Sequence, residues 1–286
     1  MERKKWLKGV VALLAALVLA GCSGSNSEKD FTSEPVNSGQ SVRITGYTGS
    51  KSVVIIPSKI KKLPVTQIGQ EAFRDKNLTS VTIPDSVISI EAGAFSDNQL
   101  TNITIPDSVT NIERSAFYGN QLTGIIIPNS VISLSGFNNN QLTSITIPNS
   151  VTLIGDAAFS DNQLTNVTIP DSVILIGEAA FSGNQLNNVT ISDSVLEISS
   201  GAFQNNQLTS VTLPNSVRFI GYRAFQNNQL TNVTLLNNYA MIGYGAFMEN
   251  RLTSVTISNT VSAKNAADLS IPISEVFDEN VRIIRQ

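Results

Sequence analysis

The amino-acid sequence predicts a β-dominated solenoid of about nine 22-residue coils, closed by an N-terminal β-hairpin cap and a C-terminal cap. The first observation behind this prediction is a phenylalanine that recurs every 22 residues, with one step of 20. A fixed period of this size is typical of a solenoid. The second is a short alternating run in every unit, such as "LTNVTIP", which is rich in β-branched residues and favours a strand. The third is size, since one unit buries too little apolar surface to fold alone and must stack on its neighbours. The recurring residues are Phe73, Phe95, Phe117, Phe137, Phe159, Phe181, Phe203, Phe225 and Phe247.

Residues 1–21 are predicted to be a lipoprotein signal peptide. The basic stretch "MERKKWLK" precedes the apolar run Gly9–Ala20, which is too short to span a membrane. "LAGC" follows and ends at Cys22, the only cysteine of the chain. This layout predicts that Cys22 receives the lipid and anchors the mature protein in a bacterial cell envelope, outside the cytoplasm. The alternative is an ordinary signal peptide with an incidental cysteine.

Two segments are expected between the lipid and the repeats. Residues 22–40 are small and polar, which predicts a flexible tether. Residues 41–57 contain two β-rich runs around a Gly-Tyr-Thr-Gly turn, which predicts a hairpin. The N-terminal cap and the first coil are therefore predicted over residues 41–73.

The repeats are predicted over residues 74–260, and the unit 164–181 illustrates their local structure. "LTNVTIP" is a strand that ends at Pro170, because proline has no N–H to donate to a ladder. Asp171 and Ser172 supply turn chemistry. "SVILIG" is a second extended segment, and "GEAAF" is one tight helical turn.

An asparagine precedes the first strand of each unit by the same step. Such side chains are expected to be buried and to bond the backbone of the bend. The alternative interpretation is a ligand-binding row. The residues are Asn98, Asn120, Asn140, Asn162, Asn184, Asn206, Asn228 and Asn250.

The repeat L-x-x-[VI]-x-[IL]-P-x-S-V-x-x-I-G-x-x-A-F resembles the BspA-type, or treponemal-type, class of bacterial leucine-rich repeats. The resemblance extends from about Val53 to Val261. It implies a curved, right-handed leucine-rich-repeat array with one strand row on the concave face. It also implies a role in adhesion at bacterial surfaces, and it brings no catalytic residues. Residues 261–286 depart from the pattern and are predicted to be the C-terminal cap.

Composition excludes several classes of function. The sequence has no histidine and one cysteine, which excludes Ser-His and Cys-His catalysis and histidine-based metal sites. The signal segment carries a net +3, so its removal from the total of −3 leaves −6, without a basic run to bind nucleic acid. Aspartate and asparagine alternate at one turn position, which favours turn chemistry over a catalytic or calcium site. We therefore predict no enzyme, no cofactor and no metal.

Two surfaces are candidates for binding a partner. The strand row exposes threonines without charge, among them Thr168, Thr190 and Thr212. The position before the second-row isoleucine becomes apolar toward the C-terminus, with two tyrosines nearby, which is typical of a partner site. The residues are Leu153, Leu175, Phe219, Met241, Tyr222 and Tyr244. The alternative for this second group is packing beneath the neighbouring turn or the C-terminal cap.

The sequence thus favours a non-catalytic module for binding and adhesion at the cell surface. Its expected partner is a host matrix protein, a cell-surface protein or a glycan, and the membrane is contacted through the N-terminal lipid. Two alternatives remain open. One is a solenoid whose threonine ladder orders water or ice, and the other is a purely structural envelope protein.

Overall fold

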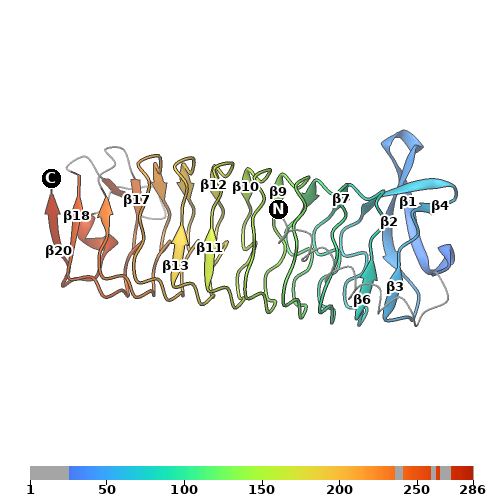
Figure 1. The fold of residues 1–286 in the computed structure, drawn as a ribbon, viewed down its shortest axis with the longest axis horizontal. Coiled ribbons are helices and arrows are strands. Elements are labelled where there is room, and N and C mark those ends of the chain that lie inside the picture. Colours follow the sequence, from blue (N-terminus) through green and yellow to red (C-terminus); the bar gives the residue numbers. More distant parts are fainter. Residues whose placement is uncertain (1–25, 236–240, 259–261, 265–271, 286) are drawn as a thin grey trace, which may run out of the picture.

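The computed structural model describes residues 26–235, 241–258, 262–264 and 272–285. Figure 1 shows the coils stacked side by side along one long axis, with additional strands covering each end. The described part contains strands, turns and three short 3₁₀ helices. The predicted β-solenoid with a cap at each end is therefore confirmed.

The N-terminal cap begins earlier than the sequence predicts. It contains the 3₁₀ helices η2 (Glu28–Asp30) and η3 (Asn37–Gly39) and the strands β1 (Phe31–Val36) and β2 (Ser41–Tyr47). These strands form an antiparallel hairpin. The Phe31 side chain is buried, and its ring centroid lies 5.5 Å from that of Tyr47. The prediction of a tether over residues 22–40 is thus wrong for the described part, because Phe31 closes the end of the core.

The hairpin also differs from the predicted one over residues 41–57. β3 (Val53–Ile55) does not return along β2 but pairs in parallel with β6 (Ser80–Thr82) in the next coil. β4 (Lys59–Ile60) and β5 (Leu63–Ile68) form a small antiparallel pair, and β5 also joins β2 in parallel. The cap is therefore continuous with the first coil.

One sheet extends from the N-terminal cap to the last coil, and we call it the long sheet. From β5 onward its strands are parallel, and each is the second extended segment of its coil. Each strand after β5 places one residue outward and the next into the core. The strands are β7 (Ser89–Ile90), β8 (Asn111–Ile112), β9 (Ser133–Leu134), β10 (Leu153–Ile154), β12 (Leu175–Ile176), β14 (Glu197–Ile198), β15 (Phe219–Ile220), β17 (Met241–Gly243) and β19 (Ser262–Lys264).

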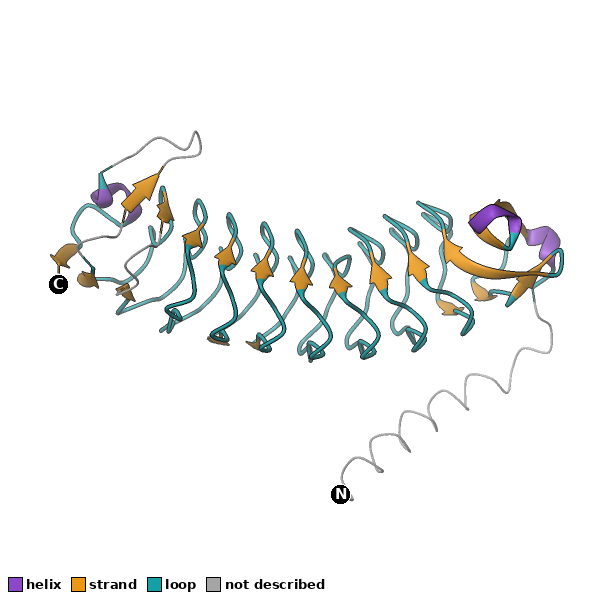
Figure 2. Ribbon diagram, turned by 90° about the horizontal axis from the view of Figure 1, so that it is seen from above, coloured by secondary structure: helices purple, strands orange, loops and turns teal. Residues whose placement is uncertain are grey.

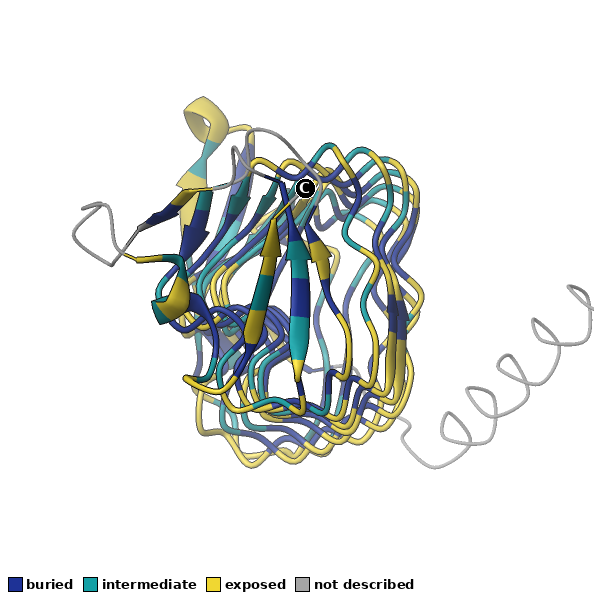
Figure 3. Cartoon of the chain, turned by 90° about the vertical axis from the view of Figure 1, so that its left-hand side faces the viewer, coloured by how far each residue is buried: buried dark blue, intermediate teal, exposed yellow. Residues whose placement is uncertain are grey.

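The "LTNVTIP" segments form a second row, the outer row, which is paired only in parts. The pairs are β3 with β6, β11 (Asn166–Thr168) with β13 (Asn188–Thr190), and β16 (Thr234–Leu235) with β18 (Ser254–Ile257) and β20 (Arg282–Arg285). Valine or isoleucine points inward, and the flanking threonine and asparagine point to solvent. Figure 3, which looks along the long axis, shows buried and exposed residues alternating around the coils.

The coils follow a shallow arc. Figure 2 shows the long sheet on its concave side and the outer row on its convex side. The concave strand row that the resemblance implies is present. It is formed by the second extended segment, however, and not by the "LTNVTIP" segment.

Two rows of side chains, one of phenylalanines and one of asparagines, hold the interior together. Both kinds of residue come shortly after a long-sheet strand in the sequence. The nine recurring phenylalanines stack with adjacent ring centroids 5.0–5.8 Å apart, and Tyr47 and Phe277 continue the stack at its ends. The asparagines bond the backbone of two coils. Asn184 donates to the carbonyl oxygens of Phe159 and Phe181 at 2.9 and 3.1 Å and accepts from the N–H of Leu164 at 3.0 Å. The predicted backbone-bonding role of the asparagines is confirmed.

The turns between the two rows explain the Pro-x-Ser-Val motif, in which Ser192 replaces the proline of its unit. The carbonyl of Pro170 accepts a hydrogen bond from the N–H of Val173 at 3.1 Å, which closes a β-turn. In most units the serine hydroxyl donates to the preceding coil, as Ser194 does to the carbonyl oxygen of Val173 at 2.9 Å. The motif therefore joins neighbouring coils as well as turning the chain.

The C-terminal cap covers the last phenylalanine of the array. The 3₁₀ helix η4 (Ile273–Val276) leads to Phe277, whose ring centroid lies 5.5 Å from that of Phe247. The N–H of Phe247 donates to the carbonyl oxygen of Val276 at 3.0 Å. The cap continues both the stack and the backbone ladder by one step.

Candidate functional site

The predicted apolar residues form one ladder on the outside of the long sheet. Leu153 pairs with Leu175, and the ladder continues through Glu197 to Phe219 and Met241. Leu153 is exposed and the others are partly exposed. The structure therefore brings Leu153, Leu175, Phe219 and Met241 to the concave face, and the described parts of the C-terminal cap leave them accessible.

A second exposed ladder lies directly beside the first and was missed in the sequence. Its residues follow the Ser-Val of each unit, and each donates its N–H to the residue one coil earlier. Ile174 donates to the carbonyl oxygen of Thr152 at 3.0 Å, for example. Its exposed apolar members are Ile88, Ile132, Ile174 and Leu196, at 46, 53, 49 and 40%.

The two ladders meet because the chain turns a corner at each coil. Val173 and Ile176 are fully buried, so that both intervening residues, Ile174 and Leu175, face outward. We use the name apolar strip for Ile132, Leu153, Ile174, Leu175, Leu196, Phe219 and Met241 together. At about 4.8 Å per coil, its five steps span roughly 24 Å. Every coil of the strip exposes at least one apolar side chain, although Glu197, Thr152 and Arg218 lie among them. An apolar surface of this kind is typical of a partner site.

The two predicted tyrosines belong to the same two coils as Phe219 and Met241. The rings of Tyr222 and Tyr244 are stacked with centroids 5.7 Å apart, and the guanidinium carbon of Arg223 lies 4.6 Å from the centroid of Tyr222. Both tyrosines lie in the turns that follow β15 and β17. Tyrosine and arginine are the residue types that most often anchor protein interfaces.

The predicted threonines lie on the opposite side of the molecule. Thr168 and Thr190 pair in register on β11 and β13, and Thr212 is exposed outside any strand. Ile126, which is 67% exposed, and Gly124 interrupt the row. The threonines and the apolar strip are therefore two separate surfaces, and one flat ligand cannot contact both.

The N-terminal end of the concave side is polar and rich in ion pairs. Arg43 contacts Glu91 at 2.8 Å, and Arg74 contacts Glu71 and Asp97 at 2.8 and 3.1 Å. The hydrogen bond to Glu71, together with the charges of Glu71 and Asp97, raises the pKa of the Arg74 guanidinium above its ordinary value. This end differs in chemistry from the apolar strip.

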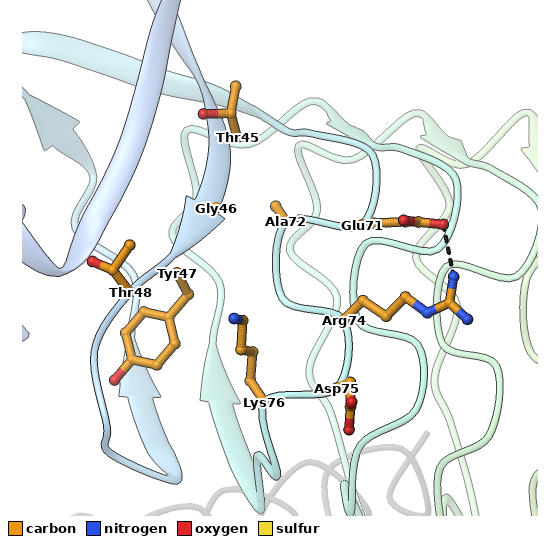
Figure 4. A pocket seen from close by; sticks show the side chains of 9 residues that line it. All are labelled: Thr45, Gly46, Tyr47, Thr48, Glu71, Ala72, Arg74, Asp75 and Lys76. Atoms are coloured by element: carbon orange, nitrogen blue, oxygen red, sulfur yellow. Dashed lines mark hydrogen bonds and ion pairs between the residues drawn. The ribbon is translucent and has the colours of Figure 1, made fainter.

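Two open cavities lie among these charged residues. The first, of about 530 Å³, separates the cap from the first coil and is lined by Tyr47, Glu71, Arg74 and Lys76 among others. Figure 4 shows the Glu71–Arg74 ion pair on one side of it and Tyr47 on the other. The second, of about 320 Å³, shares Glu71 and Arg74 and extends toward Tyr118 and Asn138.

The described residues form no cluster of three His, Cys, Asp or Glu side chains that would suit a metal ion. Within the same ranges no helix is long and apolar enough to cross a membrane. Cys22, the predicted lipidation site, lies outside the described residues.

Comparisons with known proteins agree with the repeat pattern. The family model described as "BspA type Leucine rich repeat region (6 copies)" matches residues 66–174 and again residues 152–267. Together these ranges span more than half of the 286 residues. A search of curated proteins finds no match.

Solved structures show the same fold. A leucine-rich-repeat protein of T. pallidum is 29% identical over 58% of this chain and 83% of its own, with a TM-score of 0.50. A leucine-rich cell-surface protein of Faecalibacterium prausnitzii A2-165 is 22% identical over 93% of this chain and 77% of its own, with a TM-score of 0.54. The pneumococcal vaccine antigen PcpA is 19% identical over 90% of this chain and 96% of its own, with a TM-score of 0.50.

Proposed function

Because the chain belongs to the BspA-type leucine-rich-repeat family, we propose that it is a non-catalytic binding module of the bacterial cell envelope. Its partner is a protein of the host matrix or of a cell surface, which docks on the apolar strip. The observation that carries this proposal is the meeting of two outward ladders, at Ile174 and Leu175, on the concave face.

The chemistry of the strip supports a protein as the partner. Its exposed side chains are branched and aromatic, and its last two coils carry the stacked pair Tyr222 and Tyr244 beside Arg223. Stable protein interfaces bury about 800 Å² on each partner and depend on a few such anchors. A strip roughly 24 Å long matches an interface of that size.

The placement in the envelope rests on the first 22 residues and on similar proteins. The signal layout ending at Cys22 supports a lipid anchor, and the similar structure from F. prausnitzii is titled a cell-surface protein. Replacement of Cys22 by alanine is expected to abolish incorporation of labelled palmitate. Labelling that persists in Cys22→Ala would contradict the lipid anchor.

The partner site is tested with the full chain against a panel of purified matrix proteins and host cells. The double variant Phe219→Ser with Met241→Ser is expected to reduce binding by at least about tenfold, since interface anchors of this type contribute about 2 kcal/mol or more each. The matched control is Thr168→Ser with Thr190→Ser on the convex face, which should bind like the parent. Loss of binding in the control alone would move the site to the convex face. Binding to nothing in the panel would favour a purely structural protein.

No observation favours the ice-ordering alternative over this proposal. Water ordering by a threonine ladder needs a regular, flat row. The outer row is convex, its strand pairing is interrupted, and Ile126 projects from it.

A further inference from the structure

The 20-residue step in the repeat marks a local gap in the molecule. Four residues separate Ile112 from Phe117, whereas two separate Leu134 from Phe137. The shortened turn closes through Gly136, which has a left-handed φ of 92°, and a Cβ there would collide with the backbone carbonyl of Glu113. Any residue other than glycine would therefore prevent this turn.

The missing residues interrupt the backbone ladder that joins the turns. In an intact pair of coils, the N–H of Gly93 donates to the carbonyl oxygen of Arg114 at 3.1 Å, and that of Ala157 donates to Glu178 at 2.7 Å. The equivalent N–H of Ser115 has no acceptor among the described residues, because the next coil lacks the residue that would supply one. A backbone donor is thus left available beside the gap.

The 320 Å³ cavity lies at this interrupted ladder. Ser115, Arg114 and Tyr118 of the third coil line it, together with Ser96 and Asn138 of the flanking coils. The Ser96 hydroxyl oxygen and Asn138 Oδ1 are buried, and neither has a hydrogen-bond partner in the described part of the chain. Ser96 as a whole is only 4% exposed. Buried polar atoms without partners are unusual in proteins and require an explanation.

The hydrogen-bond donors and acceptors of the cavity determine which kind of ligand could bind there. Asn138 Oδ1 needs a donor, the Ser96 hydroxyl can take either role, and the Ser115 N–H needs an acceptor. Arg114 is exposed and forms no ion pair with any described residue. Hydroxyl groups, which donate and accept at once, satisfy this mixture, whereas an anion can only accept.

Charge and shape narrow the ligand further. The lining carries two arginines, Arg74 and Arg114, against the two carboxylates Glu71 and Asp97, which disfavours a multiply charged ligand. Tyr118 lines the cavity and is 36% exposed, and the electron-rich face of a tyrosine ring attracts polarised C–H groups. The volume lies at the lower end of the range of small-molecule sites, about 300–1,000 Å³.

We propose that this cavity binds one neutral sugar ring of a glycan. The C–H face of the sugar packs on Tyr118, and its hydroxyls bond Arg114 and the Ser115 N–H. The Ser96 and Asn138 side chains, whose buried oxygens lack partners among the described residues, rotate toward the cavity to complete these bonds. The site is independent of the proposed protein partner, because the cavity is lined by residues of the first four coils and shares none with the apolar strip.

The test measures binding of methyl glycosides to the full chain by saturation-transfer NMR. The panel contains the methyl glycosides of glucose, galactose, mannose and N-acetylglucosamine, with glucuronic acid as the anionic comparison. We expect at least one neutral glycoside to bind. Tyr118→Ala and Asn138→Ala should each weaken that binding by at least about tenfold, which corresponds to the loss of about 1.4 kcal/mol. The control Tyr222→Ala removes a tyrosine outside the cavity and should leave binding unchanged.

A second variant tests the gap itself without removing any lining side chain. Replacing Ser135–Gly136 by a copy of Gly155–Ala158 restores the full turn and provides an acceptor for the Ser115 N–H. This variant should fold at least as stably as the parent in urea and lose glycoside binding. The proposal is overturned if no neutral glycoside binds the parent, if only the anionic one binds, or if Tyr118→Ala or the restored turn leaves binding intact.

Discussion

The outer row and the long sheet differ in how completely their segments pair, and their sequences do not suggest this difference. The outer row repeats "LTxVTIP" with little change and is rich in β-branched residues, yet it lacks strand pairing at residues 102–105, 124–127 and 144–147. The long sheet varies from serine to phenylalanine at its outward position, yet its ladder is continuous. Curvature explains the difference, because coils on a concave side are closer together than on a convex side. Strand propensity thus predicts extended segments, while the shape of the array determines which of them pair.

The comparison also separates residues that hold coils together from residues that are free to vary. The phenylalanine stack and the asparagine ladder follow the long sheet; the phenylalanine recurs in all nine units and the asparagine in all but the first, which has Lys76 at that position. The outward positions of the long sheet change along the axis. The following predictions are ordered from the largest expected effect to the smallest.

The largest effect is expected in the phenylalanine stack. Phe181 is fully buried, with the rings of Phe159 and Phe203 at 5.6 and 5.4 Å. Phe181→Ala should lower the free energy of unfolding in urea by about 3–5 kcal/mol, because it leaves a cavity. Ile169→Val in the outer row is the control and should cost about 1 kcal/mol. Similar losses for the two variants would refute the view that this side dominates stability.

The second-largest loss of stability is expected when the asparagine ladder is broken. Asn184→Ala removes the bonds to Phe159, Phe181 and Leu164 and leaves buried backbone groups unpaired. The unfolding free energy should fall by about 3 kcal/mol. Asn166 is exposed and donates its side-chain N–H to the hydroxyl of Thr165 at 3.2 Å, and Asn166→Ala should change stability by less than about 0.5 kcal/mol. If Asn184→Ala lowers the unfolding free energy no more than Asn166→Ala does, water has replaced the lost hydrogen bonds and the asparagines are not needed for stability.

Hydrogen exchange compares the two rows directly. The N–H groups of Gly155 and Gly177 bond the preceding coil at 2.9 and 2.8 Å. No such backbone bond joins the described outer-row residues 102–105 or 144–147. We expect protection at the two glycines to exceed that of these outer amides by about tenfold or more, or about 1.4 kcal/mol. Equal protection in native-state exchange would contradict the effect of curvature.

The smallest effect concerns a turn on the concave side. Ala179 has a φ of 52°, a left-handed conformation that costs a residue with a Cβ about 1–2 kcal/mol. Ala179→Gly relieves this strain but adds freedom to the unfolded chain, so that we expect a net gain of up to about 1 kcal/mol in thermal or urea unfolding. Ala180→Gly, at the adjacent buried position, is the control and should destabilise. A loss of stability in Ala179→Gly would show that the strain in the turn is smaller than the entropy cost of the added glycine.

The sequence predicted the coils accurately because their signal is repeated and local. The period of the phenylalanines, the inward valines and isoleucines, and the role of the asparagines all depend on contacts between identical neighbours. The N-terminal cap was harder to predict, since Phe31–Val36 occurs once and its pairing with Ser41–Tyr47 competes with another plausible hairpin. The family resemblance could not reveal which segment would occupy the concave side.

Only part of the candidate site could be predicted from the sequence, namely the part that recurs at equivalent positions of the repeat. The outward ladder through Leu153 and Leu175 was visible as a column of equivalent positions. The neighbouring column through Ile174 was equally readable, but simple alternation does not show that two consecutive residues turn outward. The cavity beside Tyr118 depends on the three-dimensional effect of a two-residue deletion, whose length alone was evident in the sequence.

The direction of the bonds between coils has a mechanical consequence. The backbone, asparagine and serine bonds that join neighbouring coils all link one coil to the next along the long axis. A pull on the two ends therefore loads these bonds in tension, one interface after another, rather than in shear across many at once. Since each coil contacts only its neighbours, interfaces yield singly. Under load the molecule therefore lengthens one coil at a time instead of unfolding in a single event.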